Sequence, residues 1–279
     1  MTPTRFGARL ADAVRAHGPL CVGIDPHPAL LTSWGLSDDA VGLERFASTV
    51  LAALAGRVAV LKPQSAFFER HGSAGIAVLE RTLRDAAGSG TLTLLDVKRG
   101  DIGSTMVGYA QAYLAAGAHL AADAVTLSPY LGFGSLAPAL ELAADTGRGV
   151  FVLARTSNPE GASVQEAIWQ GRGVGQAVVD AVSSVNAGLT PLGDVGVVVG
   201  ATHEHGLCLS ELNGPILAPG LGEQGARPAD LADRFADIDG LVLPSVSRSL
   251  LRHGPKPAAV RAAARQLNDQ LALCRINGR

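Results

Sequence analysis

The sequence predicts a (β/α)8 barrel, a closed ring of eight parallel strands surrounded by helices, with an extra helix before the first strand. Eight short apolar runs recur along the 279 residues, each followed by an alanine- and leucine-rich segment of helical length. The runs are almost continuously apolar, as expected for parallel strands covered on both faces. A doubly wound open sheet is the alternative, but it usually has fewer strands, and no G-x-G-x-x-G motif opens the first helix here. We therefore expect residues 1–279 to form a single barrel domain.

The expected elements alternate regularly along the chain. A helix over residues 4–17 precedes the first strand. The eight expected strands are PLCVGID (19–25), RVAVLKP (57–63), TLTLLDVK (91–98), DAVTLSP (123–129), GVFVLAR (149–155), VGVVVGA (195–201), GPILAPG (214–220) and GLVLPSV (240–246). Amphipathic segments between and after them are expected as helices over 40–56, 74–88, 104–117, 134–146, 174–187, 228–236 and 256–274.

Charge and composition limit the classes of partner. The formal net charge is -2 and 47% of residues are hydrophobic, so the chain can bury a large core but has no broad basic field for nucleic acid or a membrane surface. No apolar run reaches the roughly 20 residues needed to cross a bilayer, and the N-terminus lacks the apolar segment of a signal peptide. Three scattered cysteines without C-x-x-C spacing fit a reducing compartment. We expect a soluble cytoplasmic protein.

Polar residues follow nearly every expected strand. Active sites of (β/α)8 barrels lie at the carboxyl ends of the strands, in the loops that lead to the helices. The strand ends here are Asp25-Pro26, Lys62-Pro63, Asp96-Val97-Lys98, Ser128-Pro129, Arg155-Thr156-Ser157, Pro219-Gly220 and Ser247-Arg248. Because the residues before them are apolar, we expect one face of the barrel to carry the chemistry.

The stretch LLDVKRGDIGST places the densest charge at the end of the third expected strand. Asp96 and Lys98 are two apart, so their side chains are expected to point to the same face, and the barrel mouth is favoured because burying charge under helices is costly. Lys62 ends the second expected strand and Asp25 the first, so all four groups can converge. Asp101 lies just beyond, in the loop before the next helix.

An alternating array of carboxylates and ammonium groups has a chemical use. Each carboxylate favours the protonated form of the neighbouring amine and fixes its direction. Such an array suits a reaction that builds negative charge on carbon and then delivers a proton there, without a metal, because a lysine supplies the positive charge. The alternative is a structural ion-pair network that caps the barrel.

Two segments near the C-terminal end of the chain have the features of a phosphate site. APGLGEQGARP (218–228) follows the seventh expected strand, and LPSVSRS (243–249) carries the end of the eighth, where these barrels usually bind phosphate. Glycines let backbone amides approach an anion, Gln224 adds an amide donor, and Arg248 offers a bidentate fork. A plain glycine turn is the alternative.

The segment DVKRGDIGST resembles the D-x-K-x-x-D-I-x-x-T signature of orotidine 5′-phosphate decarboxylases, which make uridine monophosphate in pyrimidine biosynthesis. The resemblance extends from Asp25 to Arg248. It implies that Lys98 protonates C6 of the pyrimidine after carbon dioxide leaves, with Asp96 against the departing carboxylate. It also implies that Lys62 and Asp25 bind ribose hydroxyls and complete the charge array.

The resemblance further implies a homodimer with shared active sites and no cofactor. The aspartate that matches Asp101 reaches into the partner subunit's site in this family, with Ile102 and Thr105 beside it. The glutamine of P-G-x-G-x-Q-G and an arginine after the last strand hold the 5′-phosphate, and they match Gln224 and Arg248.

The segment ARTSNPEG resembles the family's loop that reads the pyrimidine, with Ser157 as the matching serine. A turn or helix N-cap serine is the alternative for this position. A K-P-Q-x-A-F-F-E segment after the second expected strand is similar to the longer bacterial branch of the family. The insertion 156–173 is expected to act as a lid over the phosphate or base end.

Three alternatives compete with this interpretation. A magnesium-dependent sugar-phosphate decarboxylase or aldolase of the same superfamily has a further acidic ligand before the array, where this chain has Leu94. A non-catalytic nucleotide sensor gains nothing from a proton donor such as Lys98. His203, Glu204 and His205 form an H-E-H run that lacks the H-E-x-x-H spacing of zinc sites, and we expect it to begin a helix after the sixth strand.

Overall fold

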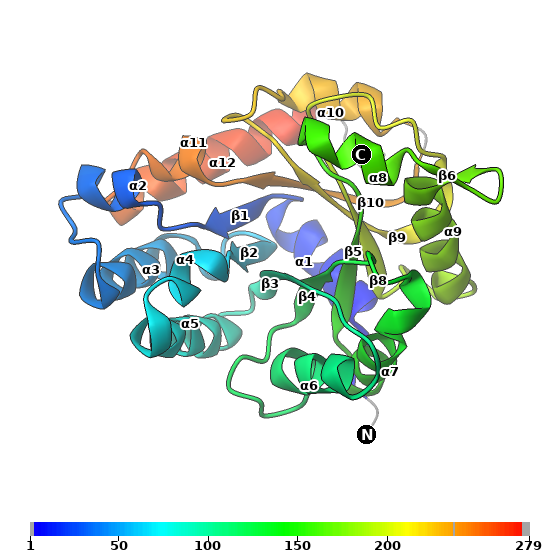
Figure 1. Ribbon diagram of the computed structural model, residues 1–279. Coiled ribbons are helices and arrows are strands. Elements are labelled where there is room, and N and C mark those ends of the chain that lie inside the picture. Colours follow the sequence, from blue (N-terminus) through cyan, green and yellow to red (C-terminus); the bar gives the residue numbers. More distant parts are fainter. Residues whose placement is uncertain (1–2, 237, 275–279) are drawn as a thin grey trace.

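The computed structural model describes residues 3–236 and 238–274, and they form a closed barrel of eight parallel strands (Figure 1). The strands, in their order around the ring, are β1 (Cys21–Ile24), β10 (Ile238–Val246), β9 (Leu209–Pro219), β8 (Val195–Val199), β5 (Gly149–Arg155), β4 (Ala124–Leu127), β3 (Leu92–Arg99) and β2 (Val60–Pro63). Pairing of β1 with both β2 and β10 closes the ring. The predicted fold is therefore confirmed.

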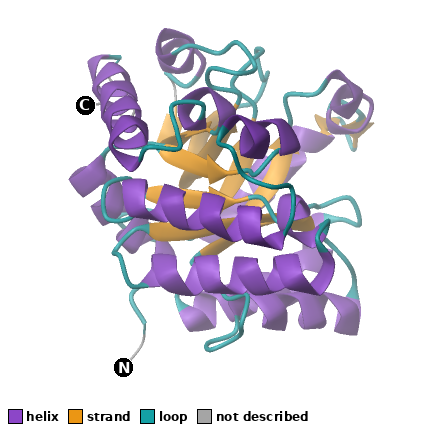
Figure 2. Ribbon diagram, turned by 90° about the vertical axis from the view of Figure 1, so that its left-hand side faces the viewer, coloured by secondary structure: helices purple, strands orange, loops and turns teal. Residues whose placement is uncertain are grey.

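Helices surround the barrel, and Figure 2 shows the strands enclosed by them. The longer ones are α1 (Phe6–His17), α3 (Ala40–Leu54), α5 (Gly72–Ala87), α6 (Gly103–Leu114), α7 (Ala137–Thr146), α9 (Val174–Asn186), α10 (Pro228–Arg234) and α12 (Pro257–Leu273). Shorter helices are α2 (Pro28–Ser33), α4 (Ala66–Glu69), η1 (Phe133–Leu136), η2 (Pro159–Gly161), α8 (Ala162–Gln165) and α11 (Arg248–Leu251). No helix within residues 3–236 and 238–274 is long and apolar enough to cross a membrane.

The helix α1, expected as the extra N-terminal helix, lies across the amino-terminal end of the strands. Phe6 packs edge-to-face on Phe151 inside the barrel, with 6.1 Å between ring centroids. A Cβ added to Gly149, the first residue of β5, would lie 2.3 Å from the Phe6 ring, so only glycine admits that ring. Arg9 forms an ion pair with Asp123, just before β4. The base of the barrel is thus closed, and polar groups gather at the opposite end.

The helix predicted to begin at the H-E-H run after the sixth strand is absent, so that prediction is wrong. Residues 200–208 contain no helix and lead directly into β9. The imidazole of His205 stacks on Phe235 with 5.3 Å between ring centroids, and its Nε2 is 2.9 Å from the carbonyl oxygen of Arg234. These contacts hold the segment against the end of α10 instead.

Candidate active site

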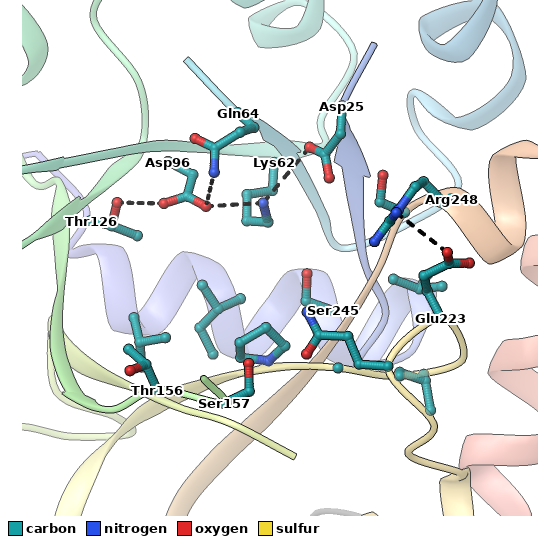
Figure 3. Close-up of a pocket in the computed structure, with 18 of the residues that line it drawn as sticks. Asp25, Lys62, Gln64, Asp96, Thr126, Thr156, Ser157, Glu223, Ser245 and Arg248 are labelled. Atoms are coloured by element: carbon teal, nitrogen blue, oxygen red, sulfur yellow. Dashed lines mark hydrogen bonds and ion pairs between the residues drawn. The ribbon is translucent and has the colours of Figure 1, made fainter. Parts of the chain in front are cut away.

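A cavity of about 400 Å³ opens at the carboxyl ends of the barrel strands (Figure 3). Residues from neighbouring strands meet there because the parallel strands end at the same edge of the barrel. The predicted site residues that line the cavity are Asp25, Lys62, Asp96, Lys98, Ser157, Gln224 and Arg248. The structure therefore brings these seven predicted residues together around one cavity, and their roles stay predictions.

Asp96 is the centre of the charge cluster. Its Oδ1 lies 2.6 Å from Lys98 Nζ, and its Oδ2 lies 3.2 Å from Lys62 Nζ. The chain has only three lysines, and two of them form ion pairs with this one carboxylate. The Asp96 and Lys62 side chains are each 8% exposed, whereas Lys98, which also lines the cavity, is 44% exposed.

The two buried charges stabilise each other's ionised forms. Burial by itself lowers the pKa of Lys62, but Asp25 and Asp96 outweigh it and raise that pKa above its ordinary value. Burial likewise raises the pKa of Asp96, yet Lys62 and Lys98 outweigh it and hold that pKa well below its usual range. Asp96 is therefore a carboxylate and Lys62 an ammonium group at neutral pH.

Two neutral side chains complete the shell around Asp96. The Thr126 hydroxyl on β4 donates to Oδ1 at 2.8 Å, and the Gln64 amide, just after β2, donates to Oδ2 at 3.1 Å. Each carboxylate oxygen thus accepts two hydrogen bonds, which is close to its full capacity. The carboxylate is held in one orientation.

The backbone at Lys98 departs from a regular strand. Its φ is 47°, in the left-handed region that non-glycine residues seldom adopt, and the pairing of β3 with β4 shifts register between Leu95 and Arg99. The amides of Val97 and Lys98 both donate to Thr126 Oγ1, each at 3.0 Å. Lys98 reaches Asp96 as predicted, but a strained turn aims it there rather than simple strand alternation.

Arg99, whose role the sequence leaves open, ties this turn to α4. Its Nη2 lies 2.5 Å from Glu69 Oε1, and the Ser65 hydroxyl donates to the same oxygen at 2.5 Å. The guanidinium group also lies 5.8 Å from the centroid of the Tyr109 ring, within range of a cation–π contact. Arg99, the residue after Lys98, is therefore held by Glu69 and by the Tyr109 ring.

Loop 220–226 and Arg248 form the opposite end of the cavity, and we call them the phosphate grip because the sequence predicts that they bind phosphate. A Cβ added to Gly222 would lie 2.4 Å from Ser249 Oγ, so the loop rests directly on α11, which begins at Arg248. Glu223 and Gln224 of the loop both line the cavity. Arg248 Nη1 lies 3.3 Å from Glu223 Oε1 (Figure 3).

Two buried polar atoms at the cavity have no hydrogen-bond partner within the described part of the chain. They are Asp25 Oδ1 and Ser247 Oγ. Asp25 Oδ1 does lie 3.9 Å from Lys62 Nζ, which is an ion-pair distance and not a hydrogen bond. Because buried polar groups are normally satisfied, these atoms fit a ligand that brings hydroxyl or other polar groups of its own.

The expected base-reading segment lies across the cavity from Asp96 (Figure 3). Ser157 lines the cavity, and a Cβ on Gly200 would lie 2.9 Å from its backbone nitrogen, so the loop after β5 packs closely on the end of β8. The insertion 156–173 continues through η2 and α8 into a hairpin of β6 (Ile168–Trp169) and β7 (Arg172–Gly173).

Three predicted site residues are not among the described residues that line the cavity of their own chain. Ile102 is 62% exposed and Thr105 is exposed on α6. Asp101 accepts a hydrogen bond from the Ile102 amide at 2.8 Å, just ahead of that helix. The roles of these three residues in a site shared between two subunits stay predictions.

A family model described as "Orotidine 5'-phosphate decarboxylase / HUMPS family" matches residues 18–263. The chain belongs to this family. A Salinispora arenicola protein named orotidine 5′-phosphate decarboxylase is 61% identical over 272 residues, 97% of each chain. The Streptomyces coelicolor protein of that name is 56% identical over 266 residues, 93% of this chain and 94% of the other. The predicted resemblance is confirmed, and with it the prediction of a decarboxylase at the level of the family.

Solved structures of similar sequence have the same fold as this chain. A Streptomyces avermitilis crystal structure superimposes with a TM-score of 0.92 at 52% identity, covering 98% of this chain and 97% of that chain. The Leishmania donovani OMP decarboxylase superimposes with a TM-score of 0.75 at 31% identity, covering 98% of this chain and 99% of that one.

Sequence reasoning missed several residues that this family member places at the cavity. They are His27, Gln64, Thr126, Glu223 and Ser245. Gln64 stands directly after Lys62-Pro63, so its place at a strand end could have identified it. Thr126 could not be recognised, because threonine is common in strands for its β-branched shape alone. Among the described residues, no group of three His, Cys, Asp or Glu side chains could hold a metal ion.

Proposed function

We propose that this protein is a carboxy-lyase that converts orotidine 5′-phosphate to uridine 5′-monophosphate in pyrimidine biosynthesis. The observation that carries the proposal is the buried Asp96 carboxylate between two lysines, at one end of a cavity whose other end holds the phosphate grip. The relatives at 56% and 61% identity with this name support the substrate. One barrel domain, residues 1–279, performs the reaction in the cytoplasm.

Lys98 is the proton donor to C6 in this proposal. Loss of carbon dioxide leaves an electron pair in a ring orbital that cannot delocalise, so a fixed ammonium group beside it stabilises the developing charge. Lys98 suits this role because it is the more exposed of the two lysines and its Nζ is 2.6 Å from Asp96. The proton then moves from Nζ to carbon, which leaves a neutral amine to be reprotonated from solvent.

The remaining groups position the substrate. Asp96 lies against the substrate carboxylate, and the unpartnered Asp25 Oδ1, with Lys62, binds the ribose hydroxyls. Gln224 and Arg248 bind the 5′-phosphate, and Ser157 reads the edge of the pyrimidine. The span from the Asp96 cluster to the phosphate grip thus orders base, ribose and phosphate along one cavity.

The reaction is proposed to need no metal or other cofactor. The magnesium-dependent relatives have an acidic ligand two positions before the first aspartate of the array. Here that position is Leu94, which is 1% exposed and packs among the apolar side chains inside the barrel. The positive charge that a metal would bring to the carbanion comes instead from Lys98.

We further propose a homodimer in which Asp101, with Ile102 and Thr105 beside it, completes the partner's site. Exposed apolar side chains in the loop after β4 support such an interface. Tyr130 is 78% exposed and Leu131 is 52% exposed. Such exposed apolar residues next to each other are typical of protein–protein contacts.

The first test is turnover of orotidine 5′-phosphate by the purified protein in excess chelator, followed by its absorbance. We expect turnover by the parent and a loss of at least about a hundredfold in Lys98→Ala, the usual scale for a positioned acid. Lys256→Ala, which removes the third lysine at an exposed position before α12, is the matched control and should retain full activity. Turnover only with magnesium and a sugar phosphate would favour the rival enzyme class, and tight nucleotide binding without turnover would favour a sensor.

A further inference from the structure

We propose that Glu223 is an internal counter-anion of the phosphate grip. Its carboxylate forms an ion pair with Arg248 when no ligand is bound, and a phosphate that binds must displace this carboxylate from Arg248. The proposal rests on the proposed function, because it takes Arg248 and Gln224 as the residues that bind the 5′-phosphate. It adds a residue that weakens the binding of any phosphate-bearing ligand at this site.

The ion pair lies where the ligand phosphate must go. Arg248 Nη1 and Glu223 Oε1 are 3.3 Å apart, and both side chains line the cavity (Figure 3). They are 45% and 46% exposed, so the contact is reachable from the cavity and is not locked in the core. Arginine binds carboxylate and phosphate oxygens with the same planar fork, so the two anions compete for it.

The backbone keeps Glu223 beside Arg248. Within the loop, the Glu223 amide donates to the Leu221 carbonyl at 3.2 Å and the Gly225 amide to the Gly222 carbonyl at 2.9 Å. Gly222 and Gly225 have φ values of 80° and 96°, in the region that favours glycine, so this tight turn depends on them. The carboxylate can therefore turn away about its own side-chain torsions while its backbone remains in the phosphate grip.

This arrangement makes every phosphate-bearing ligand bind more weakly than it would to Gln224 and Arg248 alone. A free phosphate must displace Glu223 and sit near its negative charge, with only the contacts of the grip in return. A nucleotide makes further contacts through its ribose and base, which offset that cost. After the reaction, Glu223 can take back Arg248 and so favour release of the product.

The test is isothermal titration of inorganic phosphate, uridine 5′-monophosphate and uridine into the parent and Glu223→Gln. Glutamine keeps the size of the side chain and removes the charge. We expect phosphate and the monophosphate to bind about two- to fivefold more tightly to the variant, as for the loss of one partly exposed ion pair, with uridine unchanged. The gain should shrink at high salt, because the competing charges are exposed.

Glu44→Gln is the matched control, since Glu44 forms an exposed ion pair with Arg81 on the helical surface at 2.8 Å. It makes the same change in net charge and should leave all three affinities unchanged. Equal or weaker binding of phosphate by Glu223→Gln would overturn the proposal, as would an equal gain in Glu44→Gln. If the monophosphate binds neither parent nor variant, the proposed function fails, while the phosphate titration still decides the role of Glu223.

Discussion

At the scale of single residues, Asp96 and Thr126 together determine the geometry of the site. Thr126, buried on β4, donates to the carboxylate and accepts the amides of Val97 and Lys98. One hydroxyl therefore fixes both the orientation of Asp96 and the turn that carries Lys98. A substrate carboxylate that approaches Asp96 meets a group whose hydrogen-bonding capacity is already used by the protein.

The lowered pKa of Asp96 predicts how the stability of the fold depends on pH. The unfolded-state pKa of an aspartate is about 3.9, and the folded-state value lies below it, so this carboxylate contributes stability that is fully present above about pH 4. That contribution is lost as the pH falls through the folded-state pKa. We expect the free energy of unfolding of the parent to exceed that of Asp96→Asn, with the difference shrinking below about pH 4.

Urea unfolding at a series of pH values measures this difference. Asp12→Asn is the control, because Asp12 is 71% exposed and pairs only with Arg15 along the same helix. A constant difference between parent and Asp96→Asn from pH 6 to pH 3 would contradict the expectation.

At the scale of elements, the strands and their ends were predictable and the irregular connections were not. Apolar runs identify buried parallel strands. A charged residue such as Lys62 at the end of a run is costly to bury in the core, so its position predicts the mouth of the barrel. The conformation of loop 200–208 depends on contacts with residues far away in sequence, because His205 contacts Arg234 and Phe235 at the end of α10. The Glu223–Arg248 pair is equally non-local, and a residue pattern does not show which charges meet.

The insertion 156–173 makes a prediction that fluorescence can test. The chain has two tryptophans: Trp34 is 6% exposed, and Trp169 of β6 is 60% exposed. Iodide should therefore quench Trp169 almost alone. If the insertion closes over the ligand, saturating uridine 5′-monophosphate should reduce the quenching, because Trp169 becomes buried.

Trp169→Phe is the control for this measurement. It should abolish most of the quenchable emission with and without nucleotide, which assigns the change to β6. Quenching of the parent that is the same with and without bound nucleotide would show that the insertion does not act as a lid.

At the scale of the whole molecule, the proposed sharing of Asp101 between subunits predicts complementation between two inactive variants. In the proposed homodimer, we expect Lys98→Ala and Asp101→Ala each to be inactive on its own. In a mixed dimer, the site with its own Lys98 receives Asp101 from the other subunit and is complete. Random reassortment makes half of the dimers mixed, with one working site each, so the mixture should recover roughly a quarter of the parent activity.

The two variants are to be unfolded together, refolded together and assayed beside each one refolded alone. Sedimentation of the same samples checks that they are dimers. If the mixture is no more active than either variant refolded alone, Asp101 serves its own chain or has no part in the reaction.

The helix α1 covers the amino-terminal end of a barrel whose interior is already filled by apolar side chains. At this end, Phe6 packs on Phe151, and Arg9 forms an ion pair with Asp123. Under the proposed function, substrate and nucleotide product occupy the same cavity at the carboxyl ends of the strands. We therefore expect uridine 5′-monophosphate to inhibit by competition with the substrate.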